Sequence, residues 1–155
     1  MLTSNRYLEK LHPCFPIVDV ARLALQNEGE DTNHSSTTIL DIYATTICYW
    51  HHLPSSIRQP RPDSRFAWNL AVKALQEDFL APRLSTLQAA LVDLIGRPIF
   101  SLKGNVINTG RCVALANSLG LNRDPKGWNI GAEEKSLRVR LWWGVLIHDS
   151  WFVRK

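Results

Sequence analysis

The sequence predicts an all-α fold, an irregular multi-helix bundle of about seven helices. Apolar residues recur at helical spacing, and no strand–turn–strand pattern of alternating polarity is present. Capping residues, glycines and prolines divide the chain into segments of helix length. The 155 residues, 45% hydrophobic and 21% charged, are enough for one domain with a sizeable core.

The N-terminal segment predicts two short helices joined by a rigid turn. The first helix is expected over residues 5–11. Pro13 and Pro16 then force extended or turn geometry around Phe15, whose ring can still enter the core. The second helix is expected over residues 18–26 and leads into a polar loop.

Two longer helices follow, separated by a proline-rich loop. The first is expected over residues 37–51 and the second over residues 66–79, with Asp63 as a capping residue before it. Apolar residues mark one side of each helix. On the first they are Ile39 or Leu40, Tyr43, Ile47 and Trp50, and on the second Ala67, Leu70, Ala71, Ala74 and Leu75.

The next two helices carry clear boundary signals. Ser85 and Gln88 fit a capping box, in which the serine accepts from a helical N–H and the glutamine reaches back; this helix should stop at Gly96. A helix over residues 102–119 should end at Gly120, where a left-handed cap belongs. One face of that helix would let a neighbour approach closely because its residues are small. This face consists of Val106, Gly110, Val113 and Ala114.

The last helix, over residues 132–152, begins after Gly131, and its Glu134 and Arg138 are spaced for an ion pair. Arg138 and Asp149 lie roughly 16 Å apart along the helix, so each should find a partner on another helix. Apolar residues wrap most of the circumference, which predicts a central helix covered on most sides. These residues are Leu141, Trp142, Trp143, Val145, Leu146, Ile147, Trp151 and Phe152.

The charge pattern favours neither a nucleic-acid surface nor a membrane protein. The formal net charge is +4, but the positive residues are spread singly along helical segments and form no basic block. We therefore interpret them as a solvated face. The sequence has no apolar run of signal-peptide or membrane-spanning length, which predicts a cytosolic or nuclear protein.

The residues that commonly carry chemistry do not form a recognisable site. The cysteines are odd in number, lie far apart and predict reduced thiols. His51 and His52 diverge by about 100° on a helix and have no acidic or thiol neighbour at helical spacing, which argues against a metal site. His148 and Asp149 are also adjacent and do not face each other, so His148 is interpreted as a core residue. Phosphate-binding, dinucleotide-binding and hydrolase motifs are absent.

Four segments occur in an order that is more informative than any one of them. They are His12-Pro13-Cys14-Phe15-Pro16-Ile17, Leu84-Ser85-Thr86-Leu87-Gln88-Ala89-Ala90-Leu91, Ala114-Leu115-Ala116-Asn117-Ser118-Leu119-Gly120-Leu121-Asn122-Arg123-Asp124, and Arg138-Val139-Arg140-Leu141-Trp142-Trp143 with Asp149. This order resembles the fungal-specific transcription factor domain, the middle homology region downstream of the binuclear zinc cluster in many fungal regulators. The resemblance extends from His12 to about Asp149.

The resemblance implies an all-helical, non-enzymatic regulatory domain of a nuclear protein that modulates transcription through an attached or partner DNA-binding module. It implies indirect contact with DNA, and as partners other transcription-regulatory proteins or a second copy of this chain through the tryptophan-bearing helix. A small-molecule effector is a further expectation, whereas catalytic, metal-binding and DNA-contacting residues are not expected. The motif residues would then have structural roles. They are His12, Pro13, Phe15, Pro16, Gln88, Leu119, Gly120, Leu121, Arg123, Asp124, Arg138, Arg140, Leu141, Trp142, Trp143 and Asp149.

The sequence also departs from the family pattern. The six-cysteine cluster that holds the family's zinc ions is absent, so no cofactor is expected, and Ser150 follows Asp149 where the family commonly has arginine. The family pattern usually continues beyond the tryptophan-bearing helix, so residues 1–155 are interpreted as a partial domain, truncated at its C-terminal side. Truncation should expose Trp142, Trp143 or Trp151 and favour aggregation or dimerisation. The alternative interpretation is an all-helical interaction scaffold unrelated to transcription.

Overall fold

The computed structural model describes residues 2–20, 23, 35–52, 60–96 and 102–153, and within them the fold is all-α, as predicted. The described residues form six α-helices and two 3-10 helices, with no strand. These elements are α1 (Leu2–Lys10), α3 (Ser36–Thr46), η1 (Ile47–His52), α4 (Ser64–Asp78), α5 (Leu84–Gly96), α6 (Leu102–Ser118), η2 (Pro125–Gly127) and α7 (Ala132–Val153). The helix expected over residues 18–26 lies largely outside the described residues.

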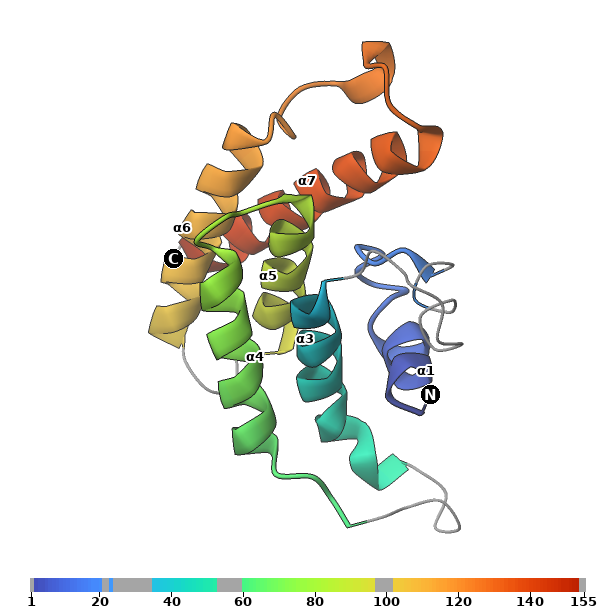
Figure 1. Ribbon diagram of the computed structural model, residues 1–155, viewed down its shortest axis with the longest axis vertical. Coiled ribbons are helices and arrows are strands. Elements are labelled where there is room, and N and C mark those ends of the chain that lie inside the picture. Colours follow the sequence, from blue (N-terminus) through green and yellow to red (C-terminus); the bar gives the residue numbers. More distant parts are fainter. Residues whose placement is uncertain (1, 21–22, 24–34, 53–59, 97–101, 154–155) are drawn as a thin grey trace.

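Helix α5 is the centre of the arrangement. It packs against α3 and α4 on one side and against α6 and α7 on the other, while α1 packs against α3 (Figure 1). Its residues from Thr86 to Leu94 are all buried, so α5 contributes to the core around its whole circumference. A main apolar cluster surrounds α5, and a smaller one joins α3 to α4 through Ile47, Trp68 and Ala71.

Helix α3 buries short polar side chains where the sequence predicted apolar ones. Ile39, Leu40 and Tyr43 are only half-buried, whereas Thr38 and Thr45 are buried, and Thr45 packs against Gly96 of α5. Small side chains allow two helices to approach closely, and here they do so although the hydroxyl groups of Thr38 and Thr45 have no hydrogen-bond partner in the structure. The predicted helix over residues 37–51 is also divided, because it tightens into the 3-10 helix η1 after Thr46.

Local signals correctly placed several helix ends. Asp63 accepts hydrogen bonds from the backbone N–H groups of Arg65 and Phe66 and so caps α4, as predicted. Gly120 has a φ of 73°, and its N–H donates to the Asn117 carbonyl, in the predicted left-handed cap of α6. These ends depend on residues close in sequence, which explains why the pattern identified them.

The capping box predicted at Ser85 is wrong. Helix α5 begins at Leu84, so Ser85 lies inside its first turn. The Arg83 N–H instead donates to Thr86 Oγ1 at 3.0 Å, which caps the helix two residues earlier. This arrangement leaves Gln88 free to bond elsewhere in the core.

The inward faces of α4 and α6 also differ from prediction. In α4, Leu70 is exposed and Trp68 is buried instead. In α6, the predicted Val106, Gly110 and Ala114 are exposed, whereas the buried stripe contains Asn105, Thr109, Cys112 and Ala116. The true stripe contains two polar residues, so hydrophobicity alone selected the wrong side of the helix.

Helix α7 is not central. Leu141, Val145 and His148 are buried against neighbouring elements, but Trp143 is 61% exposed and Trp151 is 54% exposed. Figure 1 shows α7 crossing behind α5 and α6, with contacts on one side. Apolar residues around most of the helix circumference therefore did not indicate burial on every side. The exposure of tryptophans on this helix, by contrast, was expected.

Candidate functional site

Two of the motif segments meet α7 at one place, here called the motif junction and formed by residues 12–17, Gln88 of α5 and Gly144 of α7, which directly follows the last motif segment. Gln88 Nε2 donates a 2.7 Å hydrogen bond to the backbone carbonyl of Ile17. A Cβ atom at Gly144 would lie 3.2 Å from Leu91 and 3.4 Å from Ile17, so α7 approaches closely because glycine stands there. The junction therefore joins segments that lie far apart in the sequence.

Aromatic rings complete the motif junction. Phe15 stacks on His148, with ring centroids 5.6 Å apart, and Trp151 meets both rings edge-on. The His148 side chain also stacks on Phe152, one helical turn further along α7. His148 is therefore a core residue, as the sequence predicted, and Phe15 is the ring that the proline-bounded turn places against it.

His148 is neutral in this environment. Its side chain is 1% exposed, and neither ring nitrogen has a hydrogen-bond partner in the structure. Burial lowers the pKa of His148 from 6.5 to about 4, because a charged imidazolium would lose its hydration without gaining an acceptor.

His12 lies in the turn after α1, where its backbone N–H donates to the Tyr7 carbonyl. Burial, and then the positive charge of Arg140, lower the pKa of His12. The Nε atom of Arg140 is itself buried. Pro13 and Pro16 are exposed. The structural roles that the resemblance implies for these residues stay a prediction.

A second group of motif residues closes the turn between α6 and α7. Arg138 donates from Nε to Glu134 at 2.9 Å, which is the predicted ion pair, and from Nη1 to the Leu119 carbonyl at 3.1 Å. Its guanidinium also lies 5.1 Å from the centroid of the Trp128 ring. A partner on another helix was expected for Arg138, but the carboxylate comes from its own helix and the other contacts come from the preceding turn.

The remaining residues of this turn have different exposures. Leu121 is buried in the core. Asp124 Oδ1 accepts from the Lys126 N–H and caps η2, while Arg123 is exposed. Asp149, on the last helix, is half-buried and has no hydrogen-bond or ion-pair partner among the described residues, so the partner expected for it is not observed.

The outer side of α7 carries a row of large apolar side chains, here called the aromatic stripe and formed by Val139, Trp143, Ile147 and Trp151. These residues are spaced four apart and therefore follow one side of the helix. Val139 is 42% exposed, in addition to the two tryptophans. By contrast, Leu141 is buried and Trp142 is half-buried against the main core.

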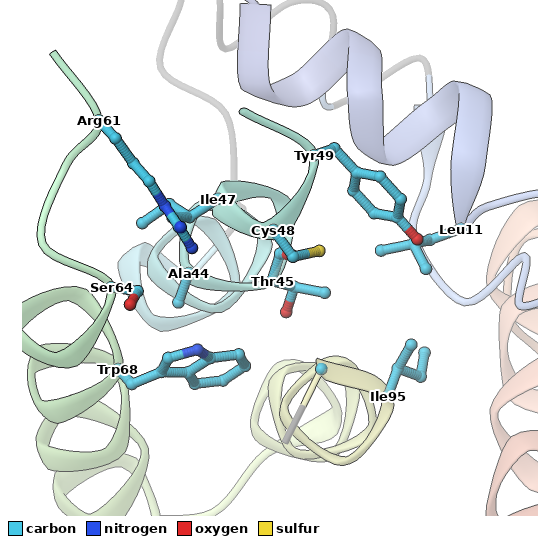
Figure 2. A pocket seen from close by; sticks show the side chains of 11 residues that line it. Leu11, Ala44, Thr45, Ile47, Cys48, Tyr49, Arg61, Ser64, Trp68 and Ile95 are labelled. Carbon is cyan, nitrogen blue, oxygen red and sulfur yellow. The ribbon is translucent and has the colours of Figure 1, made fainter. Parts of the chain in front are cut away.

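A pocket with a volume of about 340 Å³ lies between α3, α4, α5 and η1, and Leu11, just before the first motif segment, is one of its lining residues. Its wall includes Thr45, Arg61, Trp68 and Gly96, and Figure 2 shows the side chains of the first three directed toward a common space. Sequence reasoning missed this pocket, because its residues come from separate elements and share no motif spacing.

In the described part of the chain, no three His, Cys, Asp or Glu side chains are grouped so that they could hold a metal ion. No described helix combines the length and apolar character needed to cross a membrane.

With the geometry of the motif segments established, comparison with known families decides which group the chain falls in. The sequence pattern of the fungal specific transcription factor domain matches residues 5–153. The chain belongs to this family. The family is one of transcriptional regulators, so the membership points to a role in transcription regulation, and it identifies the motif junction as part of a family domain.

Two relatives with this domain are regulators of transcription by name. An uncharacterized transcriptional regulatory protein of Schizosaccharomyces pombe is 34% identical over 148 residues, which is 96% of this chain and 23% of the relative. The transcriptional activator protein DAL81 of Saccharomyces cerevisiae is 29% identical over 147 residues, or 94% of this chain and 15% of the relative. The chain therefore spans less than a quarter of either relative. No solved structure matches it.

Proposed function

We propose that this chain is a regulatory domain of a fungal transcription factor, acting in the nucleus on an attached or partner DNA-binding module. The observation that carries the proposal is the family match over residues 5–153. In this role the chain neither catalyses a reaction nor recognises a DNA sequence by itself.

The placement of the motif arginines supports the proposal that the chain does not recognise a DNA sequence by itself. Arg138 is engaged by Glu134, the Leu119 carbonyl and the Trp128 ring, and Arg140 has its Nε buried. DNA-binding proteins instead present arginine and lysine on an open surface that faces phosphates and base edges. Two of the three motif arginines therefore serve the packing of α7.

A transcription assay tests the regulatory role. We expect fusion of the full chain to an unrelated DNA-binding module to change reporter expression in yeast, relative to the module alone. The control is the same module fused to a helical protein of similar size without this domain. Equal reporter expression from all three proteins would contradict the proposal.

A binding assay tests the DNA part separately. We expect the chain alone to bind duplex DNA only weakly, without sequence preference, and to lose this binding as salt rises, because diffuse charge attraction depends on counterion release. Fluorescence anisotropy with several unrelated duplexes measures this. Tight binding of one duplex that persists at physiological salt would contradict the proposal.

We also propose that the domain contacts other transcription-regulatory proteins or a second copy of itself through the aromatic stripe of α7. Large apolar side chains in a row on a protein surface commonly mark a contact site. The exposure of Trp143 and Trp151 supports this assignment.

A further inference from the structure

The pocket between α3, α4 and α5 has the size of a small-molecule site. Its volume of about 340 Å³ falls at the lower end of the range for ligand pockets, which is roughly 300–1,000 Å³. Much of its wall is apolar or aromatic, with a few polar groups. The apolar and aromatic part consists of Leu11, Ala44, Ile47, Tyr49, Trp68 and Ile95.

The inner part of the pocket contains a polar group without a partner. Thr45 is only 4% exposed, and its Oγ1 has no hydrogen-bond partner in the structure. Buried hydroxyl groups in proteins are usually satisfied, so an unpaired one in a pocket wall marks a position where a ligand atom gains a hydrogen bond. Figure 2 shows the Thr45 side chain in the middle of the group of lining residues.

The fit between helices keeps this hydroxyl in place. A Cβ atom at Gly96 would lie 2.5 Å from Thr45 Oγ1 and 2.5 Å from the Trp68 ring. Glycine at position 96 therefore lets α5 close the inner end of the pocket against α3 and α4. This glycine sets how closely α5 approaches the Thr45 and Trp68 side chains at this end of the pocket.

The outer part of the pocket carries one positive charge. Arg61 is the charged residue among the described lining residues, and no described carboxylate lies within ion-pair distance of it. Figure 2 shows its side chain extending from the segment before α4 toward Ile47 and Ala44. The guanidinium has paired N–H donors whose geometry matches the two oxygens of a carboxylate.

The positive charge of Arg61 acts on Cys48, another residue that lines the pocket. Partial burial raises the pKa of the Cys48 thiol, while the positive charge of Arg61 acts in the opposite direction on it. Cys48 Sγ donates a 3.0 Å hydrogen bond to the Thr45 carbonyl, so this thiol lies beside the group that forms the inner wall. Cys48 is exposed and therefore reports chemically on occupation of the pocket.

We propose that this pocket binds a small carboxylate with a flat, apolar body, the carboxylate held by Arg61 and the far end of the ligand reaching Thr45. The planar part of the ligand lies among the aromatic and aliphatic walls, where Trp68 offers an indole ring. Benzoate is the simplest molecule of this class, and the hydroxybenzoates add a polar group for Thr45. The inference concerns a binding site and is independent of the proposed regulatory function.

Calorimetric titration of the full chain tests the charge requirement. We expect benzoate to bind about tenfold more tightly than benzamide, its neutral counterpart, because the amide cannot form a charge-assisted pair with Arg61. Arg61→Gln should abolish this preference. Arg65→Gln, which removes another exposed positive charge, in the first turn of α4, should retain it. Equal binding of the two probes, or unchanged benzoate binding by Arg61→Gln, would overturn the proposal.

Alkylation of cysteines locates the bound probe. Cys14 and Cys48 are exposed, whereas Cys112 is buried. We expect benzoate to slow the alkylation of Cys48 by iodoacetamide, as measured by peptide mass spectrometry, and to slow that of Cys14, which does not line the pocket, to a clearly smaller extent. No protection of Cys48, or equal protection of both cysteines, would contradict binding in this pocket.

Thr45→Val tests the inner end. Valine has nearly the shape of threonine and removes a hydroxyl that has no partner in the structure, so the variant should fold normally. We expect 3- or 4-hydroxybenzoate to bind more tightly than benzoate to the native chain, and this advantage to disappear in Thr45→Val. If the advantage remains in the variant, Thr45 is not the group that meets the ligand, and the proposed orientation is wrong.

Discussion

Acidification from pH 7 to pH 5 is expected to destabilise the protein through His148. The unfolded chain takes up a proton on this side chain near pH 6.5, whereas burial lowers the pKa of His148 in the folded protein to about 4. Between these two values the unfolded state binds more protons than the folded state. The free energy of unfolding therefore falls as pH falls through this window, and it levels off below pH 4.

The size of the effect follows from the pKa difference. Each pH unit below 6.5 reduces the free energy of unfolding by about 1.4 kcal/mol, so at pH 5 this single residue accounts for a loss of about 2 kcal/mol. The side chain is 1% exposed, so little solvent screening reduces the effect. Such a loss is a large fraction of the stability of a typical small domain.

The His148→Phe variant isolates this contribution. Phenylalanine retains the stacking between Phe15 and Phe152 and removes two ring nitrogens that have no partner. We expect the variant to be at least as stable as the native chain at pH 7 and to lose about 2 kcal/mol less between pH 7 and pH 5. His51→Phe is the matched control, because His51 is exposed at the end of α3–η1.

Urea unfolding followed by far-UV circular dichroism at several pH values measures the free energy of unfolding at pH 7 and its loss between pH 7 and pH 5. Native chain and His51→Phe should show the same acid-side loss, with His148→Phe retaining more of its stability. If all three proteins lose stability equally between pH 7 and pH 5, His148 is not neutral and desolvated in the folded state, and the reasoning is refuted.

Three further outcomes are expected. Gly120→Ala should lower the free energy of unfolding by about 1–2 kcal/mol because its φ is 73°, whereas Gly110→Ala, in an open helical position, should raise it by up to about 1 kcal/mol; equal effects in urea unfolding would contradict this. Gln88→Leu should cost about 1–3 kcal/mol by removing the bond to the Ile17 carbonyl, and an unchanged unfolding midpoint would show that water replaces it. Trp143→Ser should reduce concentration-dependent association in sedimentation experiments, and a native chain that stays monomeric at high concentration would exclude contact between copies through this residue.

The sequence predicted those features that depend on neighbouring residues. The Asp63 cap, the Gly120 cap and the Glu134–Arg138 pair each involve positions within four residues of one another. Such signals need no knowledge of the remaining fold. The all-α class follows similarly, because helical periodicity is a property of each segment.

Apart from the Ser85 capping box, a local signal that was wrong, the errors concern which side of a helix faces a neighbour. Helix α6 buries Asn105 and Thr109, and α3 buries Thr38 and Thr45, where a hydrophobic pattern places apolar residues inside. Polar residues enter these contacts because they are small, and closeness between two helices depends on both partners. A single sequence does not state which helices meet.

The pocket between α3, α4 and α5 could not be predicted from the sequence for the same reason. Thr45, Arg61 and Gly96 become neighbours only when α3, α4 and α5 pack together, and none of them belongs to the family motif segments. The motif junction was partly accessible, because the order of its segments indicated a family. That order did not reveal that Phe15 lies on His148 or that Gln88 reaches Ile17.

The contact between Phe15 and His148 has a consequence for the order in which the chain acquires its structure during synthesis. Phe15 leaves the ribosome early, whereas His148 belongs to α7, the last helix described. The turn that carries Phe15 therefore lacks part of its packing until almost the whole of this segment has been translated. Because such distant contacts form late, α7 packs onto α5 late in synthesis, and a ribosome stalled before α7 would hold a chain in which Phe15 lacks the His148 and Trp151 rings.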